Sequence, residues 1–184
     1  MNITSTQNPL IKKIALLSEK SRERKKQGLC VVEGAREIRL ALQGGYSLEN
    51  LLYQSDIFSE KQLTELLGYT AQKVIPIAIS KEVYEKISYR SSTEGVIALV
   101  QVKKHDLDTL SFKNKMPLLL VAEAPEKPGN IGALLRTADA AHIDAVIIAN
   151  PKTDLYNPNI IRSSVGCVFT VPIATGTTAE VIDF

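Results

Sequence analysis

Residues 118–149 read LLLVAEAPEKPGNIGALLRTADAAHIDAVIIA, and this stretch decides the fold class. It begins with the apolar run 118–122 and ends with a second apolar run, 145–149. Between them, residues 131–141 carry apolar side chains at helical spacing. Continuous apolar runs of this length are typical of parallel strands that are buried on both faces. The stretch therefore predicts a strand–helix–strand unit with a right-handed crossover, in an α/β domain.

The loop that joins the first apolar run to the helix is a candidate ligand site. Ligands in open α/β sheets bind beyond the carboxyl ends of the strands, where residues 123–132 (EAPEKPGNIG) are expected. Gly129 and Gly132 permit a left-handed backbone or a close approach, and Asn130 can cap the helix. The first N–H groups of that helix would attract an anion. Arg136, one turn further on, can lean back toward the loop, and on the apolar side of the helix it would need an anionic partner such as a phosphate.

Two widespread nucleotide-binding sequences are absent from the chain. Neither G-x-G-x-x-G nor G-x-x-x-x-G-K-[ST] occurs, so the sequence predicts neither a dinucleotide-binding domain nor a phosphate-loop NTPase. The residues alone leave open an α/β enzyme that binds a phosphorylated metabolite at the loop 129–132.

Composition is that of an ordinary globular protein. The chain has 184 residues, 45% of them hydrophobic, which suffices for one large domain or two small ones. No apolar run approaches the roughly 20 residues that span a bilayer, and no signal-peptide pattern opens the chain, so we expect a cytoplasmic protein. Cys30 and Cys167 lie in apolar segments and are predicted to be buried free thiols. The cysteines and the two histidines lack metal-ligand spacing, so no metal site is predicted.

Basic residues gather at the start of the chain. Residues 1–26 carry seven lysines and arginines against two glutamates, a net charge of +5, whereas the whole chain carries +2. Such a block can bind the phosphate backbone of a nucleic acid. The candidates are Lys12, Lys13, Arg22 and Arg24. A solvated helix face explains the same pattern equally well.

Strands and helices are predicted to alternate along the rest of the chain. The expected strands are 29–33, 51–54, 73–79, 95–102 and 168–173. The expected helices are 9–27, 35–43, 59–67, 81–87 and 158–164, with one more that opens at Thr177 or Thr178. The polar segment 103–116 has no sustained period, and we place a domain boundary there. The predicted division is a domain over 1–104, a linker over 105–116 and a second domain over 117–184.

Two motifs resemble those of a known family. Residues 128–138, PGNIGALLRTA, resemble the first motif of the SpoU (TrmH-like) RNA ribose 2′-O-methyltransferases of the SPOUT superfamily. Residues 157–173, NPNIIRSSVGCVFTVPI, resemble the second motif, with matches at Asn157, Arg162, Ser164 and Gly166. The family usually has glycine where this chain has His142. Here a histidine near the end of the helix can interact with the helix dipole.

The first half of the chain shares a second resemblance. Residues 31–42 and 80–100 are similar to the small substrate-binding domain that precedes many SpoU catalytic domains. Glu33, Gly34 and Arg36 match the opening of that domain. The resemblance implies that the domain grips RNA, with Glu33 and Arg36 among its contacts. The implied architecture is a small N-terminal α/β substrate-binding domain followed by a parallel-sheet α/β methyltransferase domain.

The resemblance also implies an activity, which is methyl transfer from S-adenosylmethionine to a ribose 2′-hydroxyl of rRNA or tRNA by a homodimer. It assigns the catalytic role to Arg136 with Asn130, and RNA contacts to Gly129, Gly132, Arg162 and Ser164. A guanidinium stays protonated at ordinary pH and is a poor base. We therefore hypothesise that Arg136 binds the adjacent phosphate and orients the hydroxyl, while that phosphate or water takes the proton.

The third motif of the family has no match before Phe184. The resemblance implies that this motif threads the trefoil knot and forms most of the methyl-donor pocket. We therefore expect the 184 residues alone to lack the knot, to bind S-adenosylmethionine weakly or not at all, and to transfer no methyl group. On this view the chain could act as a non-catalytic RNA-binding module.

Overall fold

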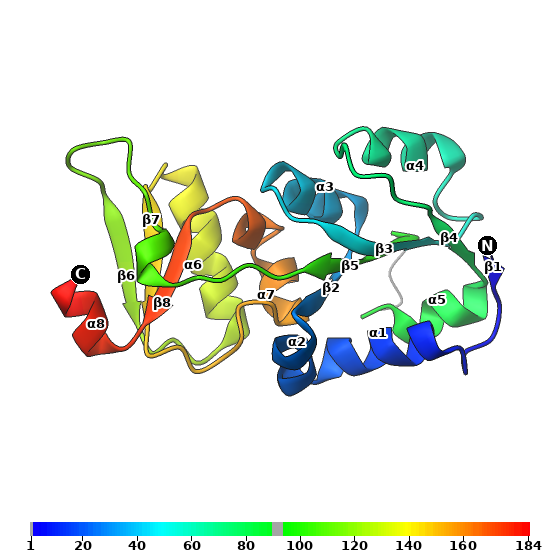
Figure 1. Cartoon of the computed structure of the whole chain (residues 1–184), viewed down its shortest axis with the longest axis horizontal. Helices are drawn as coiled ribbons and strands as arrows, with labels where there is room; N and C mark the ends of the chain where they lie inside the picture. Colours follow the sequence, from blue (N-terminus) through cyan, green and yellow to red (C-terminus); the bar gives the residue numbers. More distant parts are fainter. Residues whose placement is uncertain (1, 90–93) are drawn as a thin grey trace. The chain divides into compact units, whose positions relative to one another are not determined.

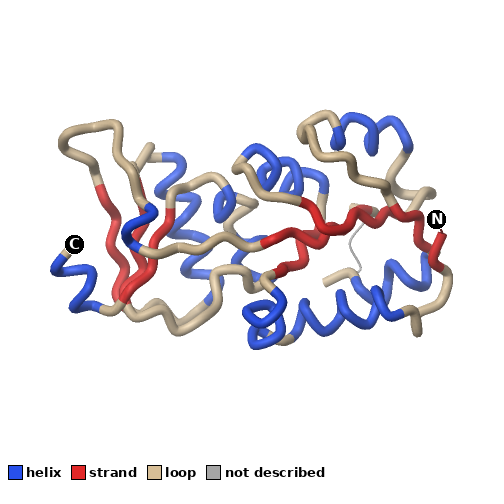
Figure 2. The backbone as a smooth tube through the Cα atoms, viewed as in Figure 1, coloured by secondary structure: helices blue, strands red, loops and turns tan. Residues whose placement is uncertain are grey.

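The computed structural model describes residues 2–89 and 94–184. The chain divides into two compact units, Met1–Val102 and Lys103–Phe184, each with its own sheet (Figures 1 and 2). The segment 105–116, which we expected to be a linker, belongs to the second unit. It is attached there because the carbonyl oxygen of His105 accepts a hydrogen bond from the backbone N–H of Thr175 at 2.6 Å. No helix in the described ranges is long and apolar enough to cross a membrane.

The first unit contains a five-stranded mixed sheet with the strand order β1-β4-β3-β5-β2. The pairs β1–β4 and β3–β4 are parallel, whereas β5 pairs antiparallel with both β2 and β3. The strands are β1 (Asn2–Ile3), β2 (Leu29–Glu33), β3 (Leu48–Tyr53), β4 (Ile77–Ile79) and β5 (Val96–Gln101). The helices are α1 (Pro9–Glu19), α2 (Ser21–Gln27), α3 (Ala35–Gln43), α4 (Glu60–Leu67) and α5 (Lys81–Ile87). The helix expected over 9–27 is thus two helices, because Lys20 takes an extended conformation (φ −107°, ψ 107°) between them.

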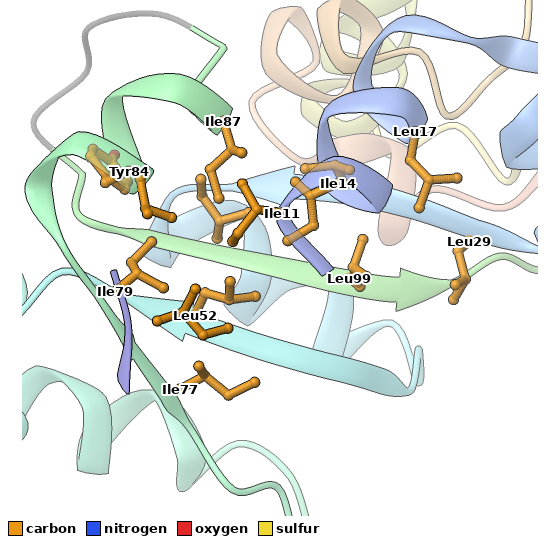
Figure 3. Packing of buried hydrophobic residues seen from close by; sticks show 14 residues of the cluster. Ile11, Ile14, Leu17, Leu29, Leu52, Ile77, Ile79, Tyr84, Ile87 and Leu99 are labelled. Atoms are coloured by element: carbon orange, nitrogen blue, oxygen red, sulfur yellow. The ribbon is translucent and has the colours of Figure 1, made fainter. Parts of the chain in front are cut away.

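Helices cover both faces of this sheet. On one face, α1 and α5 pack their apolar side chains on alternate strand residues, as Figure 3 shows for Ile11, Ile14, Ile87 and Leu99. The intervening residues of β2 and β5 are buried as well, and α3 contacts these strands. Figure 1 shows α3 and α4 on one side of the sheet and α1 and α5 on the other. Burial on both faces explains why these two strands are continuously apolar in sequence.

The second unit contains a parallel sheet with the strand order β6-β7-β8. The strands are β6 (Leu119–Glu123), β7 (Ala145–Ala149) and β8 (Ile173–Gly176). The helices are α6 (Pro128–Ala140), α7 (Pro158–Ser163) and α8 (Thr178–Asp183), and two 3₁₀ turns are η1 (Leu107–Thr109) and η2 (Cys167–Phe169). Because β6 and β7 are parallel neighbours joined through α6, the predicted strand–helix–strand unit is confirmed.

Two predictions about the strands of this unit are wrong. Strand β6 is not buried on both faces, since Val121 is 54% exposed. It is an edge strand of the sheet, whereas β7 lies in the middle and is fully buried. The strand expected over 168–173 begins only at Ile173. Val168 and Phe169 are buried in the turn η2 instead, and an apolar run does not distinguish a buried turn from a buried strand.

Helix α6 ends in a left-handed turn at His142. The N–H of Ile143 donates to the carbonyl of Ala138 at 2.9 Å, and the N–H of His142 donates to Asp139 at 3.1 Å. These are the two hydrogen bonds of a Schellman motif, and His142, with φ +52°, holds the position that favours glycine. The backbone therefore gives a more direct reason than the helix dipole for the glycine that the SpoU family usually has here.

We expect His142→Gly to raise the free energy of unfolding by about 0.5–1 kcal/mol, because glycine takes a left-handed conformation without steric cost. Chemical denaturation of both proteins at neutral pH measures the difference. His142→Ala is the control, since alanine removes the imidazole and keeps the steric cost, so it should give no gain. A similar gain in both variants would contradict the backbone explanation.

His105 is held inside the second unit by two hydrogen bonds. Its Nδ1 lies 3.0 Å from the carbonyl oxygen of Ile173, and its Nε2 lies 2.8 Å from the hydroxyl of Tyr156. Burial lowers the pKa of His105, and the nearby Lys103 acts in the same direction. The hydrogen bond to Ile173 and the charge of Asp106 oppose this shift. The folded protein therefore favours the neutral imidazole.

The protein should lose stability as the pH falls below about 6.5, the ordinary pKa of histidine. Below that pH the unfolded chain gains a proton at His105 that the folded chain resists, so this contribution is complete above pH 6.5 and is lost on acidification. Urea midpoints at pH 7.5 and 5.5 measure the loss. His105→Gln should be less stable at pH 7.5 and show a smaller decrease between the two values. An equal decrease in both proteins would assign the acid sensitivity to other groups.

Candidate functional site

Helix α6 begins three residues earlier than its sequence suggested. Pro128 occupies the first position after the N-cap residue Lys127, which suits a residue without an N–H group. Asn130 is therefore not the N-cap, and that prediction is wrong. It lies in the first turn with an exposed side chain, and its backbone N–H donates to Lys127 at 3.0 Å.

The two glycines of the first motif have different surroundings. Gly132 is buried, and a Cβ placed on it would lie 2.7 Å from both the Cβ and the carbonyl carbon of Ser163 in α7. Gly132 therefore permits the close packing of α6 on α7 and is not available for the predicted RNA contact. Gly129 is exposed, and a Cβ there would have nothing within 4 Å. The backbone at Gly129 is thus open to a ligand.

The second motif forms α7 and the turn that follows it. The Asn157 side chain accepts a hydrogen bond from the N–H of Asn159 at 2.9 Å and caps the helix. Ser164 is fully buried, donates to the carbonyl of Ile161 at 3.0 Å and accepts from the N–H of Val168 at 3.4 Å. Ser164 therefore holds this turn together, and the prediction that it contacts RNA is wrong for this conformation. Arg162 is exposed.

Arg136 is exposed on α6, not on its apolar side as expected. It lies close enough to Cys167 in η2 to act electrostatically on that thiol. Burial raises the pKa of the Cys167 thiol, Asp139 raises it further through its charge and a hydrogen bond, and Arg136 opposes the shift. Cys167 is half-buried rather than buried, whereas Cys30 is buried as predicted. Arg136, Asp139 and Cys167 thus connect the two motifs.

Two residues of this site, Asp139 and Ser163, were not predicted from the sequence. Asp139 lies one helical turn beyond Arg136, a spacing that could have indicated its proximity. Ser163 is adjacent to Ser164, but nothing in the sequence indicates that Gly132 packs against it.

A hydrogen-bonded network lies at the carboxyl edge of the second sheet. Glu123 is the last residue of β6, Asn150 comes directly after β7, and Thr178 is the first residue of α8. The Glu123 carboxylate accepts from Thr178 Oγ1 at 2.8 Å and from Asn150 Nδ2 at 3.0 Å, and these bonds lower the pKa of Glu123. A cavity of about 450 Å³ opens beside this network, lined chiefly by polar residues that include Asn150, Lys152 and Glu180.

The predicted contacts in the first unit also separate into two kinds. The Glu33 carboxylate accepts a hydrogen bond from the backbone N–H of Tyr89 at 2.7 Å and one from Tyr84 Oη at 3.5 Å. It therefore tethers the chain after α5, and residues 90–93 of the matching segment lie outside the described residues. The Arg36 guanidinium is exposed and pairs with Glu37 at 2.6 Å. Of the two, Arg36 is available to a partner and Glu33 has a structural role.

Only some side chains of the N-terminal basic block are exposed at the surface. Lys12 and Arg22 are exposed, and Lys13 lies 4.0 Å from a carboxylate oxygen of Glu49. Arg24 is 3% exposed, and its Nη1 donates to the carbonyl oxygens of Leu17 at 2.6 Å and Ser18 at 3.2 Å. Arg24 therefore stabilises the end of α1 from inside the unit, and its predicted role in RNA binding is wrong.

No group of three or more metal-ligating side chains occurs within the parts of the chain that the structure describes. The exposed cations and the open helix start at Gly129 suit an anionic partner.

Comparison with known proteins gives two family matches in succession. Residues 8–98 match the MRM3-like substrate binding domain, and residues 117–183 match the SpoU rRNA Methylase family. A 23S rRNA (uridine(2479)-2′-O)-methyltransferase of Streptomyces viridochromogenes is 32% identical over 173 residues, which are 92% of this chain and 58% of that protein. An uncharacterized tRNA/rRNA methyltransferase of Synechocystis sp. is 30% identical over 174 residues, which are 93% of this chain and 61% of that protein. The chain thus spans about three fifths of the length of these relatives.

Solved structures agree with these matches. The crystal structure of an RNA 2′-O ribose methyltransferase superposes with a TM-score of 0.80 and is 39% identical, with 100% of this chain and 68% of that chain covered. The SpoU methyltransferase AviRb from Streptomyces viridochromogenes, solved in complex with AdoMet, gives a TM-score of 0.82 at 28% identity, with 96% and 66% covered. Both motifs, the order of the two units and these similarities agree. The chain belongs to the SpoU family of rRNA methylases.

Proposed function

We propose that this protein is an RNA methyltransferase that transfers a methyl group from S-adenosylmethionine to a ribose 2′-hydroxyl of rRNA or tRNA. The observation that carries the proposal is the close packing of α6 on α7 at Gly132, which leaves Arg136 exposed beside the second motif. Relatives named as 2′-O-methyltransferases support the reaction. The family match supports this reaction over the metabolite-binding alternative.

The first unit is proposed to bind the RNA substrate, and the second to act on it. Arg36, Lys12 and Arg22 are exposed cations of the first unit and are proposed phosphate contacts. In the second unit, the open helix start at Gly129 and the guanidinium of Arg162 are proposed to hold phosphates of the nucleotide that is modified. The homodimer and the cytoplasmic location stay predictions.

Arg136 is proposed to orient the reacting nucleotide. Its planar guanidinium can bind a phosphate next to the ribose through two hydrogen bonds, which fixes the 2′-hydroxyl. S-adenosylmethionine, when bound, would supply the methyl group by breaking its sulfonium S–CH₃ bond and would leave as S-adenosylhomocysteine. The proton of the 2′-hydroxyl would pass to that phosphate or to water, because a guanidinium does not accept one. Asn130 is proposed to hold the same loop from the first turn of α6.

The cavity at the carboxyl edge of the second sheet does not fit S-adenosylmethionine. Its lining residues include no aromatic and no large aliphatic side chain, whereas an adenine ring needs apolar surfaces on its faces. We therefore derive no step of the reaction through this cavity. Calorimetric titration of the 184-residue chain with S-adenosylmethionine is expected to show no micromolar binding.

Arg136→Lys is expected to weaken binding of single-stranded RNA about threefold while the salt dependence stays unchanged, because lysine keeps the charge and loses the planar fork. Arg136→Gln should also lower the slope of log K against log salt by about 0.7. Fluorescence anisotropy with a labelled RNA measures both. Lys113→Gln removes an exposed cation outside both motifs and is the control. Unaltered affinity in both Arg136 variants would remove this residue from the site.

The methyl transfer itself is tested in cells. Ribose-methylation maps of total RNA, made with and without the gene, should differ at one or a few nucleotides. Restoring the gene with Arg136→Lys should restore those positions to at most about a tenth of their level. Identical maps with and without the gene would contradict the proposed activity.

A further inference from the structure

A groove between α3 and α4 in the first unit shares only Arg36 with the proposed RNA contacts described above. It encloses about 270 Å³. Its floor is apolar, because Phe58 and Leu66 are only 2% and 4% exposed. Its rim carries exposed charged and aromatic residues, including Arg39 and Tyr69. A groove with an apolar floor and a cationic, aromatic rim is suited to a flat ligand with a charged end.

Arg39 and Tyr69 form a preassembled surface on this rim. The guanidinium carbon of Arg39 lies 5.9 Å from the centroid of the Tyr69 ring, and the tyrosine is 41% exposed. Tyr69 lies two residues after the end of α4, and its backbone N–H donates to the carbonyl oxygen of Leu66 at 3.3 Å. Nucleobases stack on tyrosine rings and on guanidinium planes, and a ring that is already positioned loses little entropy on binding.

The charges on the rim favour a base over a bare anion. The Arg36 guanidinium is paired with Glu37 at 2.6 Å, and Glu65 adds a carboxylate to the same rim. A free phosphate inside the groove would be repelled by the charge of that carboxylate. A base in the groove with its phosphate outside, at Arg39, avoids this repulsion.

We propose that the α3–α4 groove binds an unpaired nucleobase of the RNA, stacked on Tyr69, with the flanking phosphate held by Arg39. The proposal rests on the proposed function, because it takes RNA as the partner of the first unit. It adds a defined subsite for a single-stranded nucleotide, which stacking recognises without regard to base pairing.

The test measures anisotropy of a fluorescein-labelled, single-stranded RNA dodecamer of mixed sequence with the full chain, over a range of salt. Tyr69→Leu should weaken binding about tenfold and leave the salt slope unchanged, because only stacking is lost. Tyr69→Phe keeps the ring and should bind within about twofold of the original. Arg39→Gln should weaken binding about threefold and lower the slope by about 0.7.

Lys86→Gln is the matched control for charge, since Lys86 is exposed on α5, which packs on the other face of the sheet. It should bind within about twofold of the original. Circular dichroism confirms that each variant is folded, and photocrosslinking of the bound dodecamer should identify Tyr69.

The outcomes separate this proposal from the proposed function. If the chain binds the dodecamer and both Tyr69→Leu and Arg39→Gln bind equally well, the groove is not a nucleotide subsite and RNA binding by other surfaces stands. A groove that serves a protein partner would give the same result and overturns the proposal. If the unaltered chain does not bind RNA even at low salt, the RNA-binding part of the proposed function fails and the subsite fails with it.

Discussion

Gly132→Ala is expected to lower the free energy of unfolding by about 3 kcal/mol. The added Cβ would lie 2.7 Å from two carbon atoms of Ser163, one of them the backbone carbonyl carbon, and would also collide with Ser163 Oγ. A backbone atom cannot move aside as a side chain can, so α6 and α7 must separate. For a chain of this length, that cost corresponds to a decrease in Tm of roughly 6–12 °C, measured by calorimetry.

Gly129→Ala is the matched control in the same helix. Nothing lies within 4 Å of a Cβ at that position, so the substitution should leave stability unchanged or raise it slightly. Ser163→Gly combined with Gly132→Ala should recover part of the loss, since it removes the Cβ and Oγ and leaves the carbonyl carbon in place. Equal stability of the two glycine variants would show that α6 and α7 are not packed as closely as this structure has them.

The contrast between these glycines shows what the sequence could and could not predict. The first motif was found from sequence, and so was the helix on which both glycines lie. Which glycine is buried depends on Ser163, thirty-one residues away from Gly132 along the chain, and no local pattern records that contact. A sequence predicts an element from its own residues, whereas close packing is a property of two elements together.

Strand β6 shows the same limit on a larger scale. Its apolar run predicted a strand correctly, because the length and the flanking loop residues are local features. Its burial was predicted wrongly, because exposure depends on how many strands and helices surround it. β7, with an equally apolar sequence, is fully buried since it has a strand on each side. The groove at Tyr69 and Arg39 was missed for this reason as well.

Arg24→Ala is expected to lower the free energy of unfolding by about 3 kcal/mol, through lost packing and through carbonyl groups that lose a charged hydrogen-bond donor. The guanidinium donates to Leu17 and Ser18 at the end of α1, and the side chain is almost completely buried. Urea denaturation measures the change. RNA binding, measured at a low temperature where the variant stays folded, should keep its salt slope, because a buried cation releases no counterions from RNA.

Arg22→Ala separates a surface charge from a structural one, since it removes the same charge from an exposed position in the same helix. Its stability should stay within about 0.5 kcal/mol of the original, while the salt slope for RNA binding should fall by about 0.7. Sequence alone gave these two arginines the same role. If Arg24→Ala lowered the slope and left the stability intact, Arg24 would bind RNA and its buried position would be incorrect. The opposite pattern in the two variants therefore distinguishes the part of the basic block that supports the fold from the part that can meet phosphate.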